Sequence, residues 1–142
     1  MKRTALFIIA VFSIAAFSPP LNGQGKNLED SKPYKQLMPV ALSILEGNYS
    51  PKLKDNISPE AYLINNNTYE SLFEVLGNPE KRKTFIEDKN TVVEFSQIIM
   101  PDDKTTAYVI FETKSENITN WHTIFFEIGK NKKWQVVSWH KS

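Results

Sequence analysis

Apolar residues recur at helical spacing in the first part of the chain that carries a clear pattern. They lie three and four residues apart between Leu37 and Leu45, and Gly47 follows where a left-handed cap would end a helix. Pro39 leaves two alternatives: a helix that starts near Pro33 and kinks, or a helix whose regular part begins at Pro39. Both alternatives bury the same apolar face.

Turn-forming residues dominate positions 48–60. Pro51 and Pro59 each restrict the residue before them, so we expect a short helical turn within a loop. A short strand is expected over residues 61–64.

Residues 65–77 predict a second helix. Asn67 is placed to cap it with Glu70 three residues later, and Gly77 is placed to end it. Its apolar face would consist of Leu72, Phe73, Val75 and Leu76.

The second half of the chain changes to segments rich in β-branched and aromatic residues, which predict strands. The segments cover residues 91–100, 105–115, 120–128 and 133–141. The polar connections between them are too short for parallel crossovers, so an antiparallel meander is expected. Helices followed by a sheet are typical of the α+β class, in which helices cover one face of the sheet.

The N-terminus has the pattern of an export signal. Lys2 and Arg3 precede an uncharged apolar run over residues 4–17, which is shorter than the ~20 residues that span a bilayer. We therefore predict a signal peptide at 1–23, cleaved after Gly23, although an uncleaved anchor is the alternative. A flexible lead-in at 24–32 and a single α+β domain at 33–142 would follow, secreted or periplasmic.

Composition narrows the classes of function. The chain has no cysteine, which excludes disulfides, thiolate metal sites and the lipid anchor of a lipoprotein. Removal of residues 1–23 leaves 15 basic residues against 16 acidic ones, scattered along the chain, so we expect no nucleic-acid partner. No stable membrane anchor and no cofactor are expected either.

The end of the chain resembles the last hairpin of the nuclear transport factor 2-like superfamily, in its polyketide-cyclase-like branch. In that family the final strand commonly has Trp, two aliphatic positions, then His, any residue and Ser, a pattern matched by Trp134, Val136, Val137, His140 and Ser142. Residues 61–76 and the order of elements from Leu37 onward are also similar. The resemblance implies a cystatin-like α+β cone, in which a strongly curved sheet wraps around helices and leaves a hydrophobic cavity.

The last hairpin offers candidate ligand-binding residues. If it turns at Lys130 and Asn131, strand alternation places on one face Trp121, Thr123, Phe125 and Glu127 with Trp134, Val136, Ser138 and His140. Such a face combines apolar area with a few polar groups, as a pocket for a small apolar molecule requires. A register shifted by one residue would present His122, Ile124, Phe126 and Ile128 instead, and the simpler interpretation is that the aromatic residues fill the core.

The sequence patterns that could indicate a catalytic residue are weaker than those for ligand binding, and we assign no catalytic residue. His140 is the sharpest candidate because imidazole titrates near neutral pH, but a solvated strand end is the alternative. His122 has the opposite strand parity, so the two histidines would face apart and we predict no metal site. The resemblance implies Asp, Tyr or His inside the cone of an isomerase or dehydratase, for which the available matches are Tyr62, Tyr108, Glu94 and Glu112.

These observations favour an exported, non-enzymatic domain that binds a small apolar ligand or a protein partner. Large apolar residues occur at both strand parities, with Val109 and Phe111 alternating with Tyr108 and Ile110. A homodimer through the sheet face is therefore expected. The alternative is a cofactor-independent isomerase or dehydratase that uses a polar residue in the cone cavity.

Overall fold

The structure is a computed structural model that describes residues 32–85 and 90–142. The signal peptide expected at 1–23 lies outside the described residues, as does the lead-in apart from its last residue. Within the described ranges, no helix is long and apolar enough to cross a bilayer.

The first described helix, α2 (Lys32–Glu46), contains Pro39 in its interior, so the helix starts near Pro33 as the first alternative proposed. Gly47 follows with φ of 67°, which is the left-handed cap that the sequence indicated. The short helix α3 (Pro51–Lys54) confirms the helical turn expected within the following loop.

The second predicted helix is shorter than expected. Strand β1 (Ile57–Asn65) turns back into strand β2 (Thr68–Ser71), and helix α4 (Leu72–Gly77) begins only after β2. Ser71, rather than Asn67, caps α4, since its hydroxyl accepts the backbone N–H of Glu74 at 3.4 Å. Pairing of β2 with β1 overrides the weak helical preference of Thr68 and Tyr69.

Helix α5 (Pro79–Phe85) was not indicated by the hydrophobic pattern, because Phe85 is its only buried residue. Hydrogen bonds at its N-terminal cap stabilise this helix. The Asn78 side-chain oxygen accepts the backbone N–H groups of Glu80 at 3.0 Å and Lys81 at 3.2 Å.

The four predicted C-terminal strands are confirmed, and they join β1 and β2 in one sheet. They are β3 (Val92–Ile99), β4 (Thr106–Ser115), β5 (Ile118–Ile128) and β6 (Trp134–Lys141). The strand order is β2-β1-β6-β5-β4-β3. The meander β3 to β6 is antiparallel, but β1 pairs with β6 in parallel, which makes the sheet mixed rather than wholly antiparallel.

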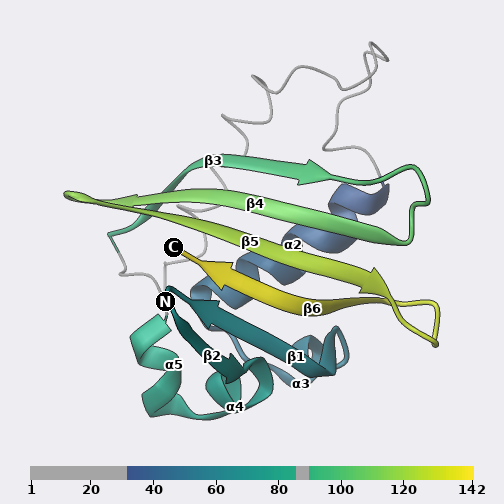
Figure 1. Cartoon of the computed structure of the whole chain (residues 1–142), viewed down its shortest axis with the longest axis horizontal. Helices are drawn as coiled ribbons and strands as arrows, with labels where there is room; N and C mark the ends of the chain where they lie inside the picture. The colour runs from purple at the N-terminus through teal and green to yellow at the C-terminus, as the bar shows by residue number, and fades with distance from the viewer. Residues whose placement is uncertain (1–31, 86–89) are drawn as a thin grey trace.

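Helix α2 lies across one face of the sheet, whereas α4 and α5 lie beside its β1–β2 edge (Figure 1). The core fills the space between α2 and the sheet. Fully buried side chains there include Leu37, Ala41 and Ile44 from α2, and Phe111, Ile124, Phe126 and Trp139 from the sheet. No helix among the described residues covers the opposite face, which we call the outer face.

A polar network is buried within this core. The Trp139 indole N–H donates to Nδ1 of His122 at 3.1 Å, and Nε2 of His122 lies 3.1 Å from Oγ1 of Thr113. His122 is 0% exposed and Trp139 is 1% exposed, so these bonds form away from solvent. Because Nδ1 accepts the hydrogen bond from the indole, the neutral tautomer of His122 carries its proton on Nε2, directed at Thr113.

Trp139→Phe keeps an aromatic ring in the core but removes the donor to His122. We expect the free energy of unfolding to fall by about 1–3 kcal/mol, because a buried acceptor loses its partner. Urea unfolding followed by circular dichroism measures the change. The matched control is Trp121→Phe, which alters a half-exposed ring on the outer face and should change stability by no more than about 0.5 kcal/mol. Equal losses in both variants would contradict the role given to the indole N–H.

Glu46 places a partly buried carboxylate at the C-terminal end of α2. Desolvation by burial raises its pKa above 4.5, and the hydrogen bond from Asn48 opposes that shift only in part. Oε1 of Glu46 is buried, and no residue of 32–85 or 90–142 forms a hydrogen bond with it. A carboxyl group whose folded-state pKa is raised contributes stability below its unfolded pKa, and this contribution is lost as pH rises through the folded pKa.

Glu46→Gln should therefore raise the thermal unfolding midpoint at neutral pH, and the gain should vanish below pH 4.5, where both side chains are neutral. Differential scanning calorimetry across this pH range measures both effects. Glu116→Gln, at an exposed turn, is the control and should show no such trend. A gain that persisted in acid would refute the explanation by desolvation.

Candidate functional site

The strand register arranges the side chains of the outer face in two rows that cross the whole sheet. The first row consists of Ser71, Tyr62, Ser138, Phe125, Tyr108 and Ile99. The second row consists of Tyr69, Ile64, His140, Thr123, Ile110 and Gln97. Direct cross-strand neighbours on one face contact each other, so each row forms a continuous strip. We call the two rows together the aromatic face.

Aromatic rings on this face stack in pairs between neighbouring strands. The ring centroids of Tyr62 and Tyr69 lie 5.0 Å apart, and those of Tyr108 and Phe125 lie 4.8 Å apart. Both separations are typical of offset-stacked rings. Tyr69 remains 69% exposed and Tyr108 remains 38% exposed. The stacked pairs thus present large apolar surfaces to solvent.

A third pair extends the aromatic area beyond the two rows. The rings of Phe95 and Trp121 lie 6.0 Å apart, and Trp121 is 44% exposed. Glu112, which pairs with both residues, brings them to the same face. The outer face therefore carries aromatic side chains from β2 at one edge to β3 at the other.

Most of the ligand-binding candidates from the sequence lie on this outer face. The structure brings together there Tyr62, Tyr108, Trp121, Thr123, Phe125, Ser138 and His140. Trp134 is separated from them, because it packs against the core on the other face. The candidates thus share a surface, and that surface faces away from α2.

The predicted pairing of the last hairpin was off by one residue at its turn. Lys132 adopts φ of 60° and lengthens the loop, so Trp134 pairs with Ile128 and Val136 with Phe126 on the core face. An extra residue, Val137, then shifts the register again. Ser138 and His140 consequently return to the face on which they were predicted.

The two histidines lie on opposite faces of the sheet, as strand parity predicted. His140 is exposed beside Tyr62, with ring centroids 6.1 Å apart, whereas His122 is buried in the core network. Among the described residues, no group of three His, Cys, Asp or Glu side chains is placed to hold a metal ion.

An open groove interrupts the outer face where β1 leaves β6. Ile57 pairs with Val136 and Tyr62 with Ser138, so four residues of β1 lie opposite Val137 alone. The extra chain of β1 bows away from β6, and Pro59 within it lacks a backbone N–H to pair. The resulting groove has a volume of about 630 Å³.

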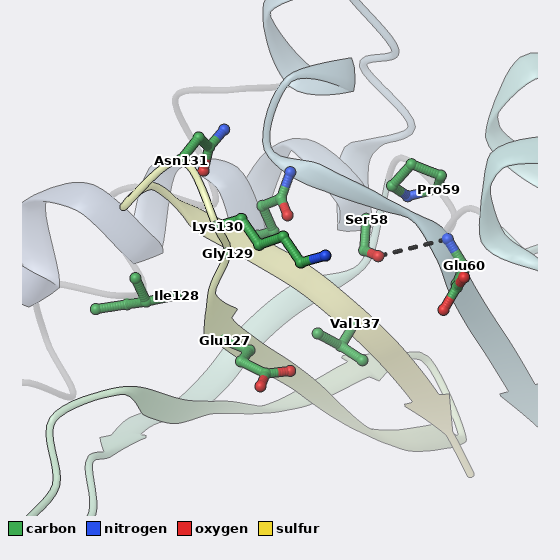
Figure 2. Close-up of a pocket in the computed structure, with 10 residues that line it drawn as sticks. Ser58, Pro59, Glu60, Glu127, Ile128, Gly129, Lys130, Asn131 and Val137 are labelled. Atoms are coloured by element: carbon green, nitrogen blue, oxygen red, sulfur yellow. Dashed lines mark hydrogen bonds between the residues drawn. The ribbon is translucent and has the colours of Figure 1, made fainter.

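The groove combines an apolar floor with charged and polar walls. Ser58, Pro59 and Glu60 come from β1, and the β5–β6 hairpin supplies Glu127, Ile128, Gly129, Lys130, Asn131, Gln135 and Val137. Figure 2 shows the Lys130 side chain extending from the hairpin toward Ser58, with Val137 between Glu60 and Glu127. No pattern in the sequence predicted this site, and the one signal for it was Pro59 within a predicted loop.

Comparison with known proteins identifies the fold through solved structures alone. No protein-family model matches the chain, and no curated protein matches it. Solved structures do match, including a ketosteroid isomerase-like protein from Erwinia carotovora atroseptica SCRI1043, at 11% identity and a TM-score of 0.57 over 79% of this chain and 96% of that chain.

Two further solved structures agree with this match. A cystatin-like fold protein from Burkholderia xenovorans LB400 has 10% identity and a TM-score of 0.57 over 80% of this chain and 93% of that one. An NTF-2 like protein from Silicibacter pomeroyi DSS-3 has 9% identity and a TM-score of 0.52 over 76% and 92%. The chain thus has the nuclear transport factor 2-like, cystatin-like α+β fold that its last hairpin and element order predicted.

Proposed function

We propose that this protein is a non-enzymatic binding domain whose aromatic face docks a second copy of the chain. The observation that carries the proposal is the stacked, solvent-exposed aromatic pairs on a sheet face that no described helix covers. Large apolar side chains that gather on one exposed face mark interaction sites.

The composition of the aromatic face supports docking of a protein surface. Neither row contains Lys, Arg, Asp or Glu, and the core of protein interfaces is depleted of charge and enriched in Tyr, Trp and Phe. Hydroxyl groups of Thr123 and the tyrosines supply hydrogen-bond partners between the rings.

A second copy suits this face better than an unrelated partner. Two-fold symmetric interfaces use the same patch on both subunits, and an uncharged patch meets its own copy without repulsion. The formal net charge of the whole chain is only +1, so long-range repulsion between copies is also weak. The export expected from residues 1–23 would place this dimer outside the cytoplasm.

The alternative of an isomerase or dehydratase has less support. It draws on the names of three structural neighbours that are called ketosteroid isomerases or ketosteroid isomerase-like, and a fold shared at 11% to 14% identity does not carry an activity. Of the acid–base candidates, Tyr62, Tyr108 and Glu112 belong to the outer face, and Glu94 pairs with Lys114 at 3.8 Å. None of them lies against the core that α2 covers.

Tyr108→Glu places a charge in the first row, beside the stacked ring of Phe125. We expect it to weaken self-association at least ~10-fold, because the carboxylate would be desolvated within the interface. Sedimentation equilibrium measures the dissociation constant directly. The control is Ile118→Glu, which puts the same charge on a 62% exposed apolar residue next to the β4–β5 turn.

Under the proposal, the parent chain and Ile118→Glu form dimers and Tyr108→Glu is a monomer at the same concentration. A parent chain that stays monomeric at high micromolar concentration would refute the dimer. So would dimers that both substitutions weaken equally.

A further inference from the structure

We propose that the groove over Val137 binds a small zwitterion of the amino-acid class, with its ammonium group on Glu127 and its carboxylate on Lys130. The groove lies on the outer face beside the β5–β6 hairpin. This inference concerns a site separate from the two rows of the aromatic face and does not depend on the dimer.

The groove is built by two irregularities that meet at one residue. Val137 has no cross-strand partner in the ladder with β1, and it has none in the ladder with β5. A bulge usually interrupts a strand on one side, and such irregularities are enriched next to binding sites. Here both neighbouring ladders shift at the same position, so a side chain at the floor of the groove faces a space that no strand fills.

The charges around the floor are of both signs and unpaired. Neither Glu60 nor Glu127 forms an ion pair with any residue in the described part of the chain, and neither does Lys130. An ammonium group offers three donors, which suits the Glu127 carboxylate together with the amide oxygen of its cross-strand neighbour Gln135. A carboxylate on the same ligand would meet the Lys130 ammonium, so a zwitterion satisfies both signs at once.

The apolar lining favours a ligand with a hydrocarbon side chain. Val137 is half-buried in the lining, and Pro59 closes the β1 side. A volume of about 630 Å³ lies within the range of ~300–1,000 Å³ that is typical of small-molecule sites. Because the groove is open and its charged groups are exposed, we expect weak binding, with a dissociation constant on the order of 0.1–1 mM.

The probe is L-phenylalanine, titrated into the ¹⁵N-labelled full chain and followed by amide chemical shifts. Phenethylamine lacks its carboxylate and 3-phenylpropionate lacks its ammonium, so each removes one half of the proposed recognition. We expect saturable shifts at Glu127, Gly129 and Gln135 with L-phenylalanine, and at least tenfold weaker binding of the other two molecules.

Two charge-removing variants test the assignment of the groups. Glu127→Gln and Lys130→Met should each weaken L-phenylalanine binding at least tenfold, whereas Glu116→Gln at the β4–β5 turn should leave it unchanged. A well-dispersed spectrum shows that each variant is folded. Repeating the titration in Tyr108→Glu separates this site from the proposed dimer, since the groove should bind equally well in that variant.

A third variant changes the shape of the groove without changing its charge. A Cβ at Gly129 would come within 2.5 Å of the Gln135 amide oxygen and displace that side chain. Gly129→Ala should therefore weaken binding in a folded protein. The absence of shifts at millimolar L-phenylalanine would overturn the proposal. Phenethylamine that binds as tightly as L-phenylalanine, with Lys130→Met strengthening both, would overturn it in favour of a simple cation site.

Discussion

The alternation of side chains along the strands is the constraint on which this structure depends. Every strand of the meander carries large apolar residues at both parities, whereas α2 covers only one face of the sheet. Burial of Phe111, Ile124, Phe126 and Trp139 against α2 therefore forces their neighbours outward. A strand that buries one set of alternate side chains against α2 turns the other set toward the outer face. The aromatic face consists of this second set.

Because side chains alternate along a strand, the register shifts of β6 determine which of its residues face outward. One extra residue in a strand moves every later side chain of that strand to the opposite face of the sheet. Because of the bulge at Val137, Ser138 and His140 face outward although Val136 faces the core. Since β1 shifts its register at the same place, the interruption opens a groove on the outer face. A residue that pairs with neither neighbouring strand thus controls both the orientation of the last strand and the location of the groove.

Local patterns in the sequence predicted most helices and strands, but they did not predict the pairing between strands that are far apart in the sequence. The β-branched segments and Gly47 act through neighbouring residues, and the structure confirms the strands and the helix cap that they predicted, although the turn of the last hairpin is one residue longer than predicted. The strand at Thr68–Ser71 was mistaken for the start of a helix because its strand character comes from pairing with β1. The parallel pairing of β1 with β6 and the double shift at Val137 depend on residues about 75 positions apart, which no local pattern encodes. For this reason the sequence placed Trp121, Thr123 and Phe125 on one face of β5, whereas it did not indicate the groove.

Thr123 and its row lie on the outer face of the sheet, whereas Ile124 faces α2. Because the chain has no cysteine, single thiols introduced at these two positions can be labelled without background. In dilute native protein, the Thr123→Cys thiol should react readily with a thiol reagent. The Ile124→Cys thiol should react only when the protein unfolds, since the parent side chain is 0% exposed. The reverse order of reactivity would shift the register of β5 by one residue and contradict the account.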